Sequence, residues 1–203
     1  MISAELSGGS LLSDATGKKQ KSAERESQAA RACLSFLLKS LPLPYTDDRP
    51  LRLQKDECGK PFLSRQGGRY DTSLPSLSLA HTHRFAMAAI DTTGADLGAD
   101  IEEIARFESP GIVRRFFTPR EFQIAETAQQ RATVWCQKEA LAKNTGKGLC
   151  REVFETDTAS DDNHDYFTLP TAILPSGTVA SICTSNNNGA PIYLPFTHED
   201  KTV

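Results

Sequence analysis

The stretch from residue 134 to residue 143, Val-Trp-Cys-Gln-Lys-Glu-Ala-Leu-Ala-Lys, decides the fold because it predicts the helix around which the rest of the chain is arranged. It contains no Gly or Pro, and Gly146 follows it as a residue suited to a left-handed helix cap. Glu139 and Lys143 lie four residues apart and therefore share one face of this helix. Taken alone, the two residues indicate an exposed ion pair that stabilises the helix by about 0.3 kcal/mol.

A second motif lies upstream, in Gly98-Ala99-Asp100-Ile101-Glu102. If this segment is extended, Asp100 and Glu102 point to one side of the strand, while Ala99 and Ile101 point to the other. Two neighbouring carboxylates repel each other, and a hard divalent cation such as Mg²⁺ suits oxygen ligands of this kind. The alternative is that both carboxylates lie on the solvated face of an edge strand.

The two motifs, their order and their separation resemble the 4′-phosphopantetheinyl transferase superfamily, in its longer, surfactin-synthetase-activating type. The resemblance covers residues 59 to 150 and is carried by four segments: Gly59-Lys60-Pro61, Ala80-His81-Thr82, Gly98–Glu102, and Trp135–Lys143 leading into Gly146-Lys147-Gly148-Leu149. It implies an α+β fold with two pseudo-symmetric half-domains, each a helix packed on a small, mainly antiparallel sheet. We place the boundary near Gly94, which gives an N-terminal half-domain of residues 1–93 and a C-terminal half-domain of residues 94–203 that carries the metal-site carboxylates.

Local patterns predict the elements of both half-domains. Residues 1–21 are expected to form a flexible lead-in, and the apolar spacing from Ser22, a suitable N-cap, to Leu41 predicts a core helix. Thr118, Pro119 and Glu121 form a capping box that predicts the start of a short helix. Strands are expected at residues 51–54, 77–82, 85–90, 152–154, 166–169, 178–183 and 191–194.

Composition narrows the classes of function. The net charge of -3 and a pI near 5.8 argue against general nucleic-acid binding. Five cysteines without a C-x-x-C pair favour free thiols in a reducing compartment. No apolar run approaches the length of a bilayer span and the first residues lack a secretory pattern, so we expect a protein in the cytoplasm, without a membrane partner. The architecture of two half-domains that the resemblance implies makes a monomer the expected oligomeric state.

The resemblance implies transfer of the 4′-phosphopantetheine arm from coenzyme A to a serine of an acyl or peptidyl carrier protein, with release of adenosine 3′,5′-bisphosphate. In that reaction Asp100, Glu102 and Glu139 would hold Mg²⁺ or Mn²⁺, and Lys143 would contact the phosphates. Glu139 is favoured as the base that takes the serine proton, and a metal-bound water is its competitor.

The resemblance also implies residues that bind coenzyme A. They are Lys60, His81, Thr82 and Lys143, with Lys18, Lys19 and Lys21 as open candidates for the 3′-phosphate. Most longer members have Ser before the histidine, whereas this chain has Ala80, which carries no hydroxyl. A hydrogen bond that the serine hydroxyl would make to the ligand must therefore come from another group.

A surface from Arg114 to Phe122 carries basic and apolar residues and could dock an acidic carrier protein. Two other interpretations of the chain remain open. One is a catalytically inactive module that binds coenzyme A or a carrier protein, and the other is a plain α+β domain with acidic surface patches.

Overall fold

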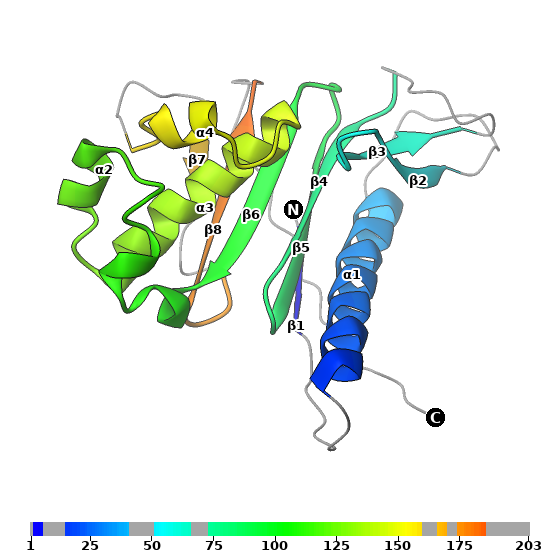
Figure 1. Ribbon diagram of the computed structural model, residues 1–203. Helices are drawn as coiled ribbons and strands as arrows, with labels where there is room; N and C mark the ends of the chain where they lie inside the picture. The colour runs from blue at the N-terminus through cyan, green and yellow to red at the C-terminus, as the bar shows by residue number, and fades with distance from the viewer. Residues whose placement is uncertain are drawn as a thin grey trace.

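The computed structural model of the chain describes residues 2–5, 15–40, 51–65, 73–159, 166–169 and 174–185. Within these ranges, the strands form three small antiparallel sheets with strand orders β1-β5-β4, β2-β3 and β6-β8-β7, and helices pack on the first and the third (Figure 1). The elements are β1 (Ile2–Glu5), α1 (Ala15–Ser40), β2 (Arg52–Lys55), β3 (Pro61–Ser64), β4 (Ser76–His81), β5 (Phe85–Asp91), β6 (Leu97–Glu103), η1 (Ile104–Phe107), η2 (Pro110–Ile112), α2 (Pro119–Ile124), α3 (Ala128–Thr145), α4 (Arg151–Glu155), β7 (Tyr166–Thr168) and β8 (Thr178–Thr184). The predicted α+β class with small antiparallel sheets is confirmed, and the pseudo-symmetry of two half-domains stays a prediction.

Helix α1 packs on the β1-β5-β4 sheet. The predicted apolar stripe is buried there, including Cys33 and Leu37, and it meets Ala86 and Ala88 of β5. The predicted start of this helix at Ser22 is wrong, because α1 already begins at Ala15. The expected flexible lead-in is also contradicted in part, since residues 2–5 pair with β5 as a strand.

Strand β6 shows the predicted alternation. Ala99 and Ile101 are fully buried between the two larger sheets, in the cluster that also contains Met87 of β5. Asp100 and Glu102 project to the other side of β6, toward α3, and are only 6% and 8% exposed. The alternative of a solvated edge strand is therefore wrong.

Helix α2 begins as its sequence predicts, and α3, which we expected over residues 126–143, runs from Ala128 to Thr145. Thr118 and Glu121 form the expected capping box of α2, and Thr127 forms a second box with Gln130 at the start of α3. Helix α3 ends at Gly146, which adopts the left-handed conformation with a φ of 69°.

A buried ion pair holds the surroundings of α3 together. Lys138 and Glu121 are both fully buried, and the Lys138 Nζ lies 2.9 Å from the Glu121 carboxylate. The same Nζ donates to the carbonyl oxygens of Val153, Phe154 and Thr156. The strand expected at residues 152–154 is wrong for this reason: the segment is helix α4, whose last carbonyls close around the lysine.

Several expectations fall outside the described residues. They are the strand at 191–194, the end of the first helix at Leu41, most of the acidic segment after Asp157, and the side chains of Lys18, Lys19 and Lys21. Among the described helices, none combines the length and apolar character that a membrane span requires.

Gly98 lets α3 approach β6 closely. A Cβ built on Gly98 would overlap the carbonyl oxygen of Ala140 and the backbone nitrogen of Asn144, both of which belong to α3. Because these are backbone atoms, they cannot move aside without shifting the helix. The glycine therefore sets the distance between the strand with two carboxylates and the helix with Glu139 and Lys143.

We expect Gly98→Ala to lower the free energy of unfolding by about 3 kcal/mol, since the added methyl group forces α3 away from β6. Urea denaturation followed by circular dichroism measures this. Gly111→Ala is the matched control, because its Cβ would meet only Ser109 Oγ, at 3.6 Å. Equal stability of the two variants would contradict the close approach.

Candidate functional site

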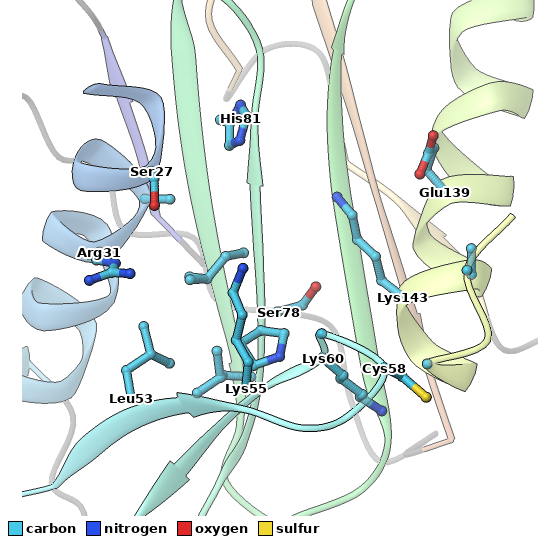
Figure 2. Close-up of a pocket in the computed structure, with 18 of the residues that line it drawn as sticks. Ser27, Arg31, Leu53, Lys55, Cys58, Lys60, Ser78, His81, Glu139 and Lys143 are labelled. Atoms are coloured by element: carbon cyan, nitrogen blue, oxygen red, sulfur yellow. The ribbon is translucent and has the colours of Figure 1, made fainter. Parts of the chain in front are cut away.

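A pocket of about 300 Å³ lies between α1, the β2–β3 hairpin, β4 and the C-terminal part of α3. Figure 2 shows α1 and α3 on opposite sides of this pocket, with the hairpin turn that carries Cys58 and Lys60 closing one end. Residues far apart in the sequence meet here, from Ser27 to Leu149. The pocket thus joins the two segments that were expected to form separate half-domains.

Basic side chains dominate the polar lining of the pocket, although the chain as a whole is acidic. They are Arg31, Lys55, Lys60, His81 and Lys143, against the single carboxylate of Glu139. Such a cleft concentrates positive potential and suits a ligand with several negative charges. Local sequence patterns do not single out Lys55, and they predict a surface or groove position for Arg31.

Lys60 lies in the predicted turn, where Gly59 has a φ of 86°. Its Nζ donates to the carbonyl oxygen of Asn144 at 2.6 Å and to Asp96 Oδ1 at 3.2 Å. Asn144 belongs to the last turn of α3, where unpaired carbonyls and the helix dipole favour a cation. Lys60 therefore links the hairpin to the C-terminal end of α3 as well as lining the pocket.

The three neighbouring residues Ala80, His81 and Thr82, at the end of β4 and in the turn to β5, have different surroundings. His81 ends β4 and lines the pocket, as expected. Thr82 is not part of the described pocket lining, and its Oγ1 accepts hydrogen bonds from the amides of Arg84 and Phe85 at 3.1 and 3.0 Å, which close the turn. Ala80 is buried in the core between the sheets, so its side chain does not face the pocket.

The acidic residues of β6 meet the face of α3 that carries Glu139 and Lys143. Lys143 Nζ donates to Asp100 Oδ1 at 2.7 Å and to the carbonyl oxygen of Ala99 at 3.2 Å. Glu102 accepts a hydrogen bond from Trp135 Nε1 at 3.0 Å and pairs with Arg106 at 2.9 Å. The sequence did not reveal Arg106, because its position depends on the turn that η1 makes after β6.

Burial and mutual repulsion shift the pKa values of these groups. Burial, and then the neighbouring Asp100, raise the pKa of Glu102 to about 7, while Arg106 and Trp135 oppose the shift. Burial and Asp100 also raise the pKa of Glu139, against the opposing charge of Lys143. Burial acts to lower the pKa of Lys143, but Asp100 and Glu139 outweigh it, so this pKa is raised and the ammonium stays charged.

The donor set suits a hard divalent cation. Asp100 Oδ2 is buried and makes no hydrogen bond, and a cation there would offset the repulsion that Asp100 exerts on Glu102 and Glu139. In the described residues, however, no three Asp, Glu, His or Cys side chains already converge on one point. Closure of all three carboxylates around a metal would therefore require side-chain rearrangement.

Comparisons with known proteins agree with this arrangement. Residues 96–186, which hold β6, α3 and the carboxylates, match the family model of the 4′-phosphopantetheinyl transferase superfamily. Over these residues the chain is similar to this superfamily. It is also similar to the 4′-phosphopantetheinyl transferase of Bacillus subtilis, with 30% identity over 126 residues, which are 56% of this chain and 50% of that protein.

A second relative is the 4′-phosphopantetheinyl transferase psf-1 of Bacillus pumilus. It is 32% identical over 106 residues, which are 48% of this chain and 44% of that protein. The chain thus spans about half the length of the two curated relatives that it matches. The family match covers Asp100, Glu102, Glu139 and Lys143, whereas Lys60, His81 and Thr82 precede it.

The contacts of Lys60 predict a structural role besides ligand binding. We expect Lys60→Met to lower the free energy of unfolding by about 1 kcal/mol without any ligand, because the α3 carbonyl loses its cationic donor. Thermal or urea denaturation measures this. Lys55→Met is the control, since Lys55 lines the same pocket and forms no ion pair with another described residue. Unchanged stability of Lys60→Met would leave Lys60 with the ligand role alone.

Proposed function

We propose that this protein transfers the 4′-phosphopantetheine arm of coenzyme A to a serine of an acyl or peptidyl carrier protein. The observation that supports it most strongly is the basic pocket beside α3, which adjoins the carboxylates of β6. A basic pocket suits the three phosphate groups of coenzyme A, and the carboxylates supply sites for Mg²⁺ or Mn²⁺ and for a base. The match of residues 96–186 to the superfamily model supports the same reaction class.

In this reaction the serine Oγ forms a bond to the β-phosphorus of the pyrophosphate, and the bond from that phosphorus to the bridging oxygen breaks. Adenosine 3′,5′-bisphosphate leaves with the bridging oxygen, and the serine proton passes to a base. A bound Mg²⁺, held by Asp100, Glu102 and Glu139, would neutralise charge on the pyrophosphate. The pocket residues would position the 3′-phosphate and the pyrophosphate of coenzyme A, which lowers the entropic cost of reaching an in-line geometry.

Glu139 is the proposed base. It lines the pocket one turn before Lys143, and burial and Asp100 raise its pKa in the metal-free protein. Lys143, one turn further along α3, is held by Asp100 and stays protonated. We assign it to the phosphates as a fixed positive charge.

His81 and Lys60 are proposed contacts for the phosphates of coenzyme A, because both line the pocket. Arg31 of α1 and Lys55 at the end of β2 also line the pocket (Figure 2). The role of Thr82 in this proposal is indirect: its hydroxyl closes the turn that presents His81.

The proposal is tested by incubating an apo acyl carrier protein with coenzyme A, Mg²⁺ and the protein, and measuring the intact mass of the carrier. We expect a gain of about 340 Da, the mass of the arm, which a chelator abolishes. Glu139→Gln should slow the gain by about 100-fold or more, since the base is removed while the shape is kept. Glu126→Gln, which alters an exposed carboxylate outside the pocket, is the matched control.

The result that would contradict the proposal is the absence of any mass gain with several carrier proteins. If coenzyme A still bound under those conditions, the protein would be a catalytically inactive binding module.

We also propose that an acidic carrier protein docks on the surface around α2. Arg114 and Arg115 are exposed there, and Phe122 and Ile124 are 40% and 43% exposed. Arg120 on the same surface is paired with Asp157 at 2.8 Å, so it offers less free charge. Exposed cations around apolar side chains complement a partner with acidic and apolar groups.

Reversing the charge of this surface should weaken docking without touching the pocket. We expect Arg114→Glu/Arg115→Glu to raise the KM for carrier protein about 10-fold at low salt and to leave the KM for coenzyme A unchanged. The double variant Lys39→Glu/Arg52→Glu makes the same charge change on exposed residues of the other half and is the control. Equal KM values for the two double variants would place docking elsewhere.

A further inference from the structure

Arg106 contacts the buried Glu102 carboxylate from outside the core. Arg106 Nη1 lies 2.9 Å from Glu102 Oε1 and 3.1 Å from Oε2, and Trp135 Nε1 donates to Oε1 at 3.0 Å. A carboxylate offers about four acceptor positions, two on each oxygen. Both positions on Oε1 are thus filled by donors, and one position remains open on Oε2.

Asp100 lies two residues earlier on the same face of β6, and it too has one acceptor position filled by a cation and another left open. Its Oδ1 accepts from Lys143 Nζ at 2.7 Å, and its Oδ2 is buried without a hydrogen-bond partner. Each carboxylate of the pair is therefore held by a cation and still has acceptor capacity left on its other oxygen. An open buried oxygen is costly unless a ligand completes it.

The local fold fixes Arg106 in this position. Strand β6 ends at Glu103, and η1 (Ile104–Phe107) turns the chain back so that Arg106 meets the residue four positions before it. The guanidinium also lies 5.7 Å from the ring centroid of Phe107, and this ring lies 6.4 Å from that of Trp135. Two aromatic rings and the arginine thus surround one side of the Glu102 carboxylate.

The Arg106–Glu102 pair differs from an ordinary surface ion pair of the same spacing. Arg151 and Glu155 are also four residues apart and lie 2.6 Å from each other, but their side chains are 89% and 62% exposed. The Glu102 side chain is only 10% exposed, so its orientation is set by its donors rather than by water. The two pairs therefore form a natural comparison.

We propose that Arg106 is a positioning residue for a divalent cation: together with Trp135 it orients Glu102 so that Oε2 stays available on the same side of β6 as the open Oδ2 of Asp100. The inference deepens the proposed function, because it concerns the carboxylates assigned to the metal. Groups that orient metal ligands in this way commonly change metal affinity by 10- to 100-fold when they are removed. Arg106 acts through Glu102 and is not assigned to the substrate.

Trp135 provides the measurement. It is the only tryptophan of the chain, and its indole N–H is bonded to Glu102, so a cation bound by Glu102 should change its fluorescence. We would titrate the wild type, Arg106→Gln and Arg106→Lys with MnCl₂ and MgCl₂, without coenzyme A or carrier protein, and confirm binding by calorimetry. Arg151→Gln is the matched control.

We expect saturable binding by the wild type and by Arg151→Gln, and a Kd about 10-fold higher for Arg106→Gln. Arg106→Lys keeps the charge but not the planar group, so its Kd should lie between these values. Circular dichroism of each variant shows whether a higher Kd comes from unfolding or from a change in the orientation of Glu102. If Arg106→Gln does not fold, Arg106→Lys alone tests the inference.

An unchanged or lower Kd for Arg106→Gln would overturn the inference, since Arg106 would then be neutral or would compete with the cation. Absence of cation binding by the wild type in calorimetry would overturn it as well. If cation binding follows the expected order but no carrier protein gains mass, the proposed transfer fails while the role of Arg106 stands. If the carrier protein gains mass but Arg106→Gln binds the cation as tightly as the wild type, the proposed transfer stands and the role of Arg106 fails.

Discussion

The close packing of α3 across β6 is the constraint on which the candidate site depends. At Gly98 the backbone of the strand lies against the backbone of the helix, and no side chain separates them. This contact lets Lys143 reach Asp100 and lets Trp135 reach Glu102. The buried pair of Lys138 and Glu121 acts on the other side of the helix, where it ties α3 to α2 and α4. Lys138 thus anchors the helix, whereas its neighbour Glu139 faces the pocket.

Much of the fold follows from local sequence because the signals are local. Thr118 and Glu121 satisfy each other's backbone groups within one turn, and Gly146 supplies the left-handed residue that ends α3. The alternation in β6 likewise predicted which side chains enter the core. The start of α1 at Ala15 was missed because residues 15–21 carry no apolar periodicity, although several of them favour helices.

The remaining features depend on contacts between distant residues, which local patterns do not encode. Val153 and Phe154 favour strands, yet their carbonyls turn toward the buried Lys138 Nζ and form α4. Lys60 and Lys55 are both lysines near one turn, and only the fold shows that Lys60 binds the end of α3. The motif residues were therefore predictable as a set, whereas their hydrogen-bond partners, Arg106 above all, required the structure.

The distribution of the five cysteines provides one reactive thiol in the wall of the pocket. Cys33, Cys136 and Cys183 are buried and therefore shielded from reagents. Burial also raises the pKa of Cys33 to about 12 and that of Cys136 well above its ordinary value, so the thiols of Cys33 and Cys136 stay protonated. Cys58 is exposed and lies in the pocket wall next to Lys60. A thiol reagent added to the folded protein therefore reaches Cys58 before the buried thiols, and a molecule that fills the pocket covers it. The rate of alkylation at this one position becomes a direct measure of pocket occupancy, independent of any turnover.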